Sequence, residues 1–402
     1  MKKILILMIE VGSGHKTPAL AVKDAIEKIA PHQFQIEVVD FAKESGAIRV
    51  DRFLKNSWNL ALAHPAVTKV INYAIDVFYP ITSSRNLLRI LFGDFVRKGI
   101  EYIRKFQPDV VYSTHFFCGT IAAIAKEKYL LSYEIIITMT DPFVGHRMWI
   151  DNHFNSILAA NQIAADYLIK NGMRKEKIQI IPLPIQANFF REIGPSDEIK
   201  ERFGLDKNKL TLLFSAGGQG IGKNWEYIQS IYRKALPVNI IAVCGKNQDL
   251  FQSLYALQKQ KNSNTTLRIF GYVDFMNMLL SIADVFVTKA GPASVIESLI
   301  CGCPIIFTHW VGYNEKGNLD YCLNQEVGWF APDTKTFLIL VEKILEQEDL
   351  LNRYRKNIEK LKTTTVLKQI SDGSHLTAQY VISRLQSFSN NSKEFRERVR
   401  YE

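Results

Sequence analysis

The sequence predicts an α/β protein made of two domains, each a doubly wound parallel sheet with helices on both faces. Its 402 residues exceed what one core normally supports. Short β-branched runs alternate with longer helix-periodic segments along most of the chain. A proline-punctuated segment, 182–195, separates two such series. Two domains of ordinary size explain all three observations.

The first series predicts an N-terminal domain over residues 1–185. Its opening apolar run resembles a secretion signal, but Glu10 and a glycine turn cut the run short. We therefore interpret the run as a buried first strand. The expected strands of this domain are 3–9, 35–39, 110–113, 134–139, 156–159 and 179–181.

The second series predicts a C-terminal domain over residues 186–375, which opens with a short helix at 197–203. Residues 338–386 are helix-periodic, and we expect 376–402 to form a helix that returns to the first domain and ends in a frayed polar tail. The expected strands of the second domain are 211–215, 239–243, 267–270, 285–288, 304–308 and 328–330.

Composition narrows the functional classes. Hydrophobic content of 47% and charged content of 22% are typical of a folded globular protein. The five cysteines include the closely spaced Cys301 and Cys303, which we interpret as reduced cytosolic thiols. A net charge of +10 favours a nucleotide, a nucleic acid or an acidic membrane surface. Because no zinc-knuckle, arginine-tract or ribonucleoprotein pattern accompanies it, we do not expect a nucleic-acid partner.

The first glycine turn joins the first strand to a helix expected at 19–30. It reads Gly12-Ser-Gly14-His15, and its glycines let backbone amides approach a ligand closely. The turn lacks the third glycine of a dinucleotide fingerprint and the lysine spacing of a P-loop. At a helix start the imidazole of His15 should stay neutral and can act as a base. The alternative is that His15 only caps or packs the turn.

The second glycine turn, 215–222, follows the first strand of the second domain. Free amides at Gly217, Gly218 and Gly220 suit a pyrophosphate, and the Ser215 hydroxyl can donate a further hydrogen bond. Such ligands bind at this position in doubly wound folds. The alternative is a flexible connecting loop.

A third junction follows the strand that ends at Thr288. A helix expected to start near Pro292 directs free amides at an anion, and the Glu297 carboxylate can accept both hydroxyls of a ribose. Farther along, Glu315 and Asn318 offer an acid and an amide for sugar hydroxyls, or alternatively cap a helix.

Taken in order, these motifs resemble glycosyltransferases of the GT-B fold, in particular monogalactosyldiacylglycerol synthases and processive diacylglycerol glucosyltransferases. The peptidoglycan N-acetylglucosaminyltransferase is a more distant relative. The resemblance extends from residue 4 to about 385 and implies two Rossmann-like domains facing a deep cleft. Besides the three junctions it rests on Thr140-Asp141 with His146 and Trp149, Pro182-Leu-Pro184, Cys244-Gly-Lys-Asn247, Gly271-Tyr-Val273 and Asn314-Glu-Lys-Gly-Asn318.

The resemblance implies an inverting transfer of galactose or glucose from a UDP-sugar to diacylglycerol. His15 looks like the base, Asp141 is the competing candidate, and His146 and Trp149 look like acceptor-side residues. No Asp-x-Asp pair occurs in the chain, so we expect neither metal nor cofactor, with the UDP-sugar as a substrate. The implied donor-binding residues are Gly14, Ser215, Gly217, Gly218, Gln219, Gly220, Tyr272, Val273, Gly291, Pro292, Ala293, Ser294, Glu297, Glu315 and Asn318.

The third junction also departs from the family. It reads Gly291-Pro-Ala-Ser, where plant galactolipid synthases usually carry Gly-Pro-Gly-Thr and the glucosyltransferases commonly carry Pro-Gly-Gly. The donor therefore stays open between galactose, glucose and N-acetylglucosamine. Two other readings also stay open: a polyprenyl-linked or other lipid as acceptor, and a nucleotide-sugar-binding protein without turnover.

A lipid acceptor implies attachment to a membrane. No run approaches the ~20 apolar residues that span a bilayer, so we expect peripheral binding at the cytoplasmic face of the cell membrane. Residues 49–105 hold ten Lys or Arg against four acids. The alternative is an ordinary helical insertion with solvated charges. Expected headgroup contacts are Arg85, Arg89, Arg97 and Lys98, and the interleaved aromatics are Trp58, Tyr73, Phe78, Tyr79, Phe92 and Phe95.

Overall fold

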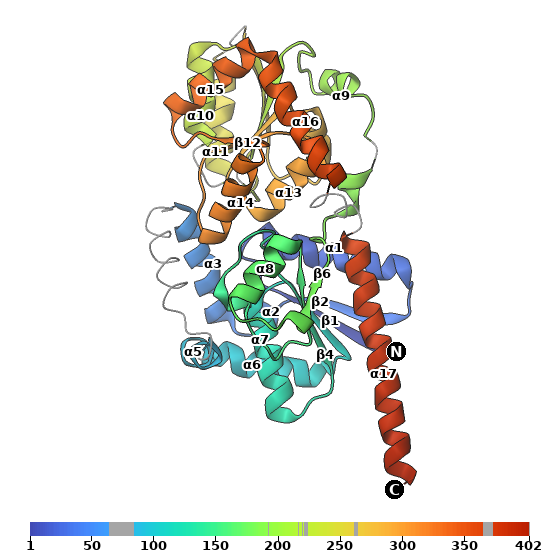
Figure 1. Ribbon diagram of the computed structural model, residues 1–402. Coiled ribbons are helices and arrows are strands. Elements are labelled where there is room, and N and C mark those ends of the chain that lie inside the picture. The colour runs from blue at the N-terminus through green and yellow to red at the C-terminus, as the bar shows by residue number, and fades with distance from the viewer. Residues whose placement is uncertain are drawn as a thin grey trace. The chain divides into compact units, whose positions relative to one another are not determined.

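The chain folds into two compact units (Figure 1). A computed structural model describes residues 1–63, 84–191, 193–215, 217–218, 220, 224–260, 264–364 and 373–401. The first unit combines Met1–Asn59 and the described part of Ile71–Gln186 with the C-terminal helix. The second unit is built mainly from residues 187–364.

The first unit contains a six-stranded sheet in the order β2-β1-β3-β4-β5-β6, and every neighbouring pair is parallel. Each strand lies within one residue of its predicted bounds. The strands are β1 (Lys2–Met8), β2 (Phe34–Asp40), β3 (Val110–Ser113), β4 (Glu134–Thr138), β5 (Ser156–Ala159) and β6 (Ile178–Ile180).

Helices cover both faces of this sheet because successive side chains of a strand point to opposite faces. Leu5 and Leu7 pack into one core cluster with α6 (Gly93–Phe106), α7 (Phe116–Tyr129) and α8 (Gln162–Lys170). Ile4 and Ile6 pack into another with α1 and the C-terminal helix. The other helices in this part of the chain are α1 (Ser13–Ile29), α2 (Phe41–Glu44), α3 (Ile48–Ala63) and α5 (Ser84–Leu91).

The second unit repeats this architecture with a six-stranded parallel sheet in the order β12-β11-β10-β7-β8-β9. Its strands also lie within one residue of the predicted bounds. They are β7 (Leu210–Ser215), β8 (Val238–Val243), β9 (Thr266–Phe270), β10 (Val285–Thr288), β11 (Ile305–Phe307) and β12 (Gly328–Phe330).

The helices of the second unit also form its core. Leu212 and Phe214 of β7 pack with buried side chains of α10, α11 and α15, while α12 also contacts β7. The helices are α9 (Ser196–Arg202), α10 (Asn224–Lys234), α11 (Gln248–Gln258), α12 (Met276–Ile282), α13 (Pro292–Ile300), α14 (Tyr313–Asn324), α15 (Thr334–Glu346) and α16 (Glu348–Thr364).

The C-terminal helix α17 (Gly373–Tyr401) packs against α1, as Figure 1 shows. It continues through the segment for which the sequence predicted a frayed tail. Arg384 of α17 pairs with Glu134 of β4 through an Nη2–Oε2 distance of 2.6 Å. The hydroxyls of Tyr380 and Ser156 lie 2.6 Å apart. Polar contacts thus join α17 to the sheet beside the apolar packing.

We expect Arg384→Met to lower the free energy of unfolding by about 1–2 kcal/mol, because it leaves the buried Glu134 carboxylate without its cation. The loss is smaller than for a fully buried ion pair because the Arg384 side chain is 38% exposed and water screens the pair. Urea denaturation followed by circular dichroism measures it. The matched control is Arg353→Met, whose pair with Glu326 is exposed on both sides; an equal loss in both variants would contradict the prediction.

Candidate active site

The first group of candidate residues lies where strands of the first sheet end. Because β1 pairs with β3 and β3 with β4, the loops that follow these strands meet at one edge. Helix α1 begins at Ser13, six residues before its predicted start, so His15 lies in the first turn of the helix. Gly12 has φ 137°, a conformation that favours glycine, and it makes the turn between β1 and α1.

The tautomer of His15 is fixed by its neighbour Thr114. Nδ1 of His15 lies 2.6 Å from the Thr114 carbonyl oxygen, which can only accept, so Nδ1 carries the proton and donates. The Thr114 hydroxyl in turn donates to the His15 carbonyl at 2.7 Å. The Thr140 hydroxyl lies 3.2 Å from the same Nδ1. The lone pair on Nε2 is therefore available to accept a proton.

The protonation state of His15 agrees with a base. Burial is the main cause that lowers its pKa below the usual 6.5, and the charge of His146 lowers it further. The contact with Thr114 and the charge of Asp141 act in the opposite direction without reversing the shift. We expected a neutral imidazole from the helix start, whereas desolvation is the larger cause. His15 is neutral at pH 7.

Asp141, the competing base, is buried and held by Trp149. The Trp149 indole donates to Oδ2 of Asp141 at 2.8 Å, and the indole itself is fully buried. We expected Trp149 to be an acceptor-side cleft residue, but its burial assigns it to holding the Asp141 carboxylate. His146 is partly exposed and precedes the short turn Arg147–Trp149. His15 is partly exposed and Asp141 is buried, so His15 is the more exposed of the two candidate bases.

The sequence did not single out a second histidine, His115, at the end of β3. Its ring centroid lies 4.6 Å from that of His15. Nδ1 of His115 accepts the Phe117 amide at 3.2 Å, so its proton resides on Nε2. Burial and the nearby His15 hold its pKa well below 6.5. His115 follows a buried strand, as His15 does, and this position was the signal that could have identified it.

The glycine loop after β7 is supported by the turn that follows β8. The Gly218 carbonyl accepts the Lys246 amide at 3.0 Å, and the Asn247 side chain donates to the Gly220 carbonyl at 3.0 Å. Gly220 has φ 64°, and a Cβ there would lie 1.9 Å from the Cys244 carbonyl oxygen, so only glycine fits. At Gly217 and Gly218 a Cβ would meet open space, which leaves room for a ligand. Ser215 ends β7 beside them, and Gln219 lies outside the described residues.

Helix α13 starts beside an open backbone segment. Gly291 precedes the helix, no described side chain caps it, and Pro292 occupies the first turn. The Val295 amide already bonds the Gly291 carbonyl, whereas the amides of Ala293 and Ser294 have no carbonyl within the helix. These two amides and the helix dipole make a site for an anion.

Glu297 lies one and a half turns into α13. Its side chain is partly exposed, and desolvation raises the pKa of its carboxyl to about 8. Tyr272 and Val273 follow β9, and Tyr272 is well exposed. A Cβ on the adjacent Gly271 would lie 3.8 Å from the Gly245 carbonyl oxygen. The turns after β8 and β9 therefore meet.

Glu315 and Asn318 lie on α14. Both carboxylate oxygens of Glu315 are bound by the protein, whereas Oδ1 of Asn318 has no hydrogen-bond partner among the described residues. Glu315 is 2% exposed; one of its oxygens pairs with Lys289 and the other accepts the Val311 amide at 2.8 Å. Asn318 is fully buried and donates to the Ala290 carbonyl at 2.9 Å. Both side chains thus hold the segment between β10 and α13. We assign Glu315 to positioning this segment instead of the sugar contact implied by the resemblance, and the sugar contact of Asn318 stays a prediction.

The four expected headgroup contacts have different surroundings. Arg85 is bound by Asp151 and Glu127, and Lys98 donates to the Gly46 carbonyl at 2.8 Å, so we leave both out of a membrane surface. Arg89 is exposed, and Arg97 is exposed while pairing with acids of its own helix. Among the aromatics of this region, Phe95 is fully buried in the core, and Tyr73, Phe78 and Tyr79 lie outside the described residues.

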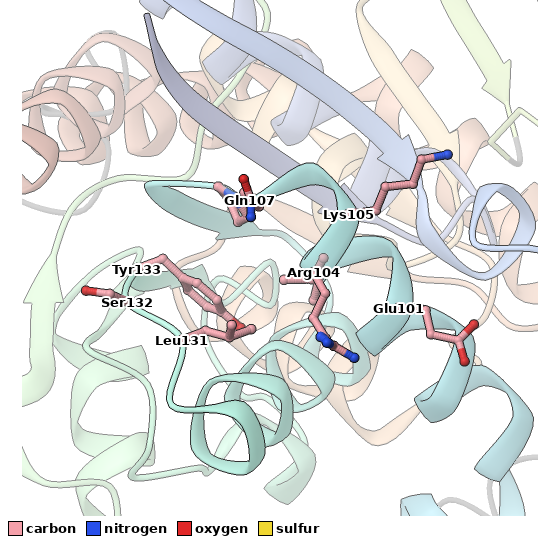
Figure 2. A pocket seen from close by; sticks show the side chains of 9 residues that line it. Glu101, Arg104, Lys105, Gln107, Leu131, Ser132 and Tyr133 are labelled. Atoms are coloured by element: carbon pink, nitrogen blue, oxygen red, sulfur yellow. The ribbon is translucent and has the colours of Figure 1, made fainter.

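A surface groove of about 560 Å³ lies in the first unit between α6 and the loop before β4 (Figure 2). Gln107 and Pro108 line it just before β3, and Leu131 and Ser132 line it before β4. These residues belong to the amino-terminal edge of the parallel sheet, opposite the edge that carries His15. The groove is therefore separate from the candidate active site. Within the described part of the chain, no cluster of three metal-ligating side chains is found.

Comparison with known proteins identifies the family. Residues 15–185 match the family model of monogalactosyldiacylglycerol (MGDG) synthase, and residues 196–361 match that of glycosyl transferases group 1. The fold matches MurG of Acinetobacter baumannii with a TM-score of 0.60 at 14% identity, over 95% of this chain and 100% of that chain. The chain is a glycosyltransferase of the GT-B fold.

Several similar curated relatives are named MGDG synthases. A probable MGDG synthase 3 of Oryza sativa subsp. japonica is 25% identical over 95% of this glycosyltransferase and 78% of that protein. The MGDG synthase 3 of Arabidopsis thaliana is 24% identical over 94% and 82%. A probable MGDG synthase of Glycine max is 26% identical over 85% of this chain, and the match spans 64% of that protein.

The fold alone does not choose the reaction. A UDP-GlcNAc 2-epimerase of Neisseria meningitidis, bound to UDP-GlcNAc, matches this glycosyltransferase with a TM-score of 0.59 at 11% identity, over 95% of this chain and 100% of that one. Epimerisation and glycosyl transfer therefore share this architecture. The reaction has to be argued from the side chains at the carboxyl edges of the two sheets.

Proposed function

We propose that this glycosyltransferase moves a hexose, galactose or glucose, from a UDP-sugar to the free hydroxyl of diacylglycerol with inversion at the anomeric carbon. The observation that carries the proposal is the fixed tautomer of His15, which leaves its Nε2 lone pair available at neutral pH. The MGDG synthase model over residues 15–185, which include His15, supports a diacylglycerol acceptor.

The acceptor hydroxyl gives its proton to Nε2 of His15 as its oxygen attacks the anomeric carbon. The bond from that carbon to the diphosphate breaks, UDP leaves, and the new glycosidic bond has the opposite configuration. The carboxylate of Asp141 stabilises the imidazolium that forms, because its charge raises the pKa of His15. The Thr114 carbonyl keeps the ring oriented through both protonation states.

The second unit would hold the donor. The amides of Gly217, Gly218, Ala293 and Ser294 would receive the diphosphate, whose charge grows as UDP leaves. The Gly220 amide instead donates to the Gly217 carbonyl at 2.9 Å. The Glu297 carboxylate would accept the ribose hydroxyls. The exposed Tyr272 with Val273 would flank the uracil. In this arrangement backbone amides would bind the diphosphate, and side chains would bind the nucleoside.

We further propose that the first unit attaches peripherally to the cytoplasmic face of the membrane. No helix in the described ranges combines the length and apolarity that crossing a bilayer requires. Exposed apolar side chains of this unit on α3 and α5 include Phe53, Ile90 and Leu91. Arg89 is exposed beside them and suits an anionic headgroup. Apolar side chains flanked by cations are typical of interfacial attachment.

The test is incubation of the purified protein with liposomes that contain diacylglycerol and, in separate reactions, UDP-galactose, UDP-glucose or UDP-N-acetylglucosamine. Lipid products are identified by mass spectrometry and their anomeric linkage by NMR. We expect a β-linked hexosyl diacylglycerol from an α-linked donor. If product formed only with a polyprenyl-linked acceptor, that lipid and not diacylglycerol would be the substrate. Tight UDP binding without product on any acceptor would reject transfer.

A further inference from the structure

Four phenylalanines form a continuous row in the first unit, which we name the aromatic track: Phe53, Phe92, Phe117 and Phe116. The ring centroids of Phe53 and Phe92 lie 6.0 Å apart, those of Phe92 and Phe117 5.6 Å, and those of Phe117 and Phe116 4.7 Å. The row thus joins α3, the start of α6 and the first turn of α7.

The inner end of the aromatic track reaches the base. Phe116 lies 4.3 Å from the ring of His115, whose ring in turn lies 4.6 Å from that of His15. Phe116 also packs edge-on against Trp149 at 5.3 Å, and Trp149 holds Asp141. The track therefore ends at the side chains that we assign to proton transfer.

The outer end reaches solvent among other apolar side chains. Phe53 is 57% exposed. Ile90 and Leu91, the last two residues of α5, are 77% and 61% exposed and directly precede Phe92. Phe92, Phe116 and Phe117 are partly exposed, unlike the fully buried core residues Phe95 and Phe154. Phe92, Phe116 and Phe117 pack against the core of the first unit and keep part of their surface exposed, so they can support the fold and also offer apolar surface to a ligand.

We infer that the aromatic track binds the acyl chains of the acceptor. The inference rests on the proposed function and adds the place of the lipid tails to it. Diacylglycerol joins one reacting hydroxyl to two long apolar chains, so a site for it needs a base next to an extended apolar surface that opens towards lipid. The track meets these requirements, because it starts beside His15 and ends between the exposed residues of α3 and α5.

The occupant follows from this continuity. A soluble sugar or nucleotide would be expected to meet polar side chains along its path, whereas the track offers phenyl rings up to the two histidines. Trp58 of α3 adds a further aromatic side chain near the base, since its Nε1 lies 3.5 Å from the position that a Cβ on Gly12 would take. The surroundings of the hydroxyl-activating turn are thus largely aromatic.

Kinetic measurements test the assignment with Phe92→Ala and Phe117→Ala. We expect each to raise KM for long-chain diacylglycerol in mixed micelles about tenfold, as expected when a phenyl ring is lost from an apolar contact. The KM for the UDP-sugar and turnover on dihexanoylglycerol should change far less. Phe92→Leu should restore most of the KM. The matched control is Tyr255→Ala on α11, an exposed aromatic of the second unit.

Photolabelling gives a readout that is independent of turnover. A diacylglycerol with a diazirine near the end of one acyl chain is irradiated with the protein, and labelled peptides are identified by mass spectrometry. We expect label in 84–106 and 116–129 and its loss in the Phe92→Ala Phe117→Ala double variant. Label confined to segments outside 48–63, 84–106 and 116–129, or unchanged KM values for long-chain acceptor in both single variants, overturns the inference. Label in these segments without any glycolipid product would keep the lipid site and reject only the proposed transfer.

Discussion

Replacing His15 by alanine is expected to lower kcat for glycolipid formation about 10²–10⁴-fold, the usual contribution of a positioned general base. The acceptor hydroxyl then lacks the Nε2 lone pair that the Thr114 contact makes available. The Kd for UDP should stay unchanged, because the proposed diphosphate contacts lie in the second unit. Turnover in the liposome assay and UDP binding by calorimetry measure the two effects.

The pH profile separates a base from a structural histidine. Because the pKa of His15 is lowered below 6.5, the imidazole is neutral at pH 7, and kcat/KM should fall only as the pH drops through that lowered value. The matched control is His32→Asn, an exposed histidine of the first unit with φ 59°, which asparagine tolerates. Near-normal turnover of His15→Ala would reject His15 and move the assignment to Asp141, to be tested as Asp141→Asn.

The strands were predictable because buried parallel strands are short apolar runs between turn signals. The start of α1 was not. The helix was expected at 19–30, after Pro18, whereas it begins at Ser13 and contains the proline. The earlier start places His15 on a rigid helical turn, and the Gly12 backbone makes the break between strand and helix.

The position of the active site was predictable to the level of loops, but the orientation of its side chains was not. His15 was found because it follows a buried strand. Its tautomer depends on Thr114, which is 99 residues away in sequence. The same limit explains Glu315 and Asn318, whose partners Lys289 and Ala290 lie 26 and 28 residues away. Contacts between distant loops decide whether a polar group faces a ligand or the protein, and periodicity carries no information about them.

UDP should bind about tenfold more tightly at pH 9 than at pH 7 if the Glu297 carboxylate accepts the ribose hydroxyls. Desolvation raises the pKa of this carboxyl to about 8 in the free protein, so about one molecule in eleven is ionised at pH 7 and about ten in eleven at pH 9. Hydroxyl donors stabilise the ionised form, and binding therefore releases a proton. If Glu297 bound the ribose as the neutral acid, the affinity for UDP would instead fall as the pH rises.

Calorimetry of UDP binding in two buffers of different ionisation enthalpy measures both the affinity and the released proton. Glu297→Gln should lose the pH dependence between 7 and 9 and bind about 10–100-fold more weakly than the wild type at pH 9, since hydrogen bonds to a charged acceptor contribute about 1.5–3 kcal/mol. Glu198→Gln on the exposed start of α9 is the matched control and should keep the wild-type profile. A pH-dependent affinity that persists in Glu297→Gln would assign the titrating group elsewhere and leave the ribose without its proposed acceptor.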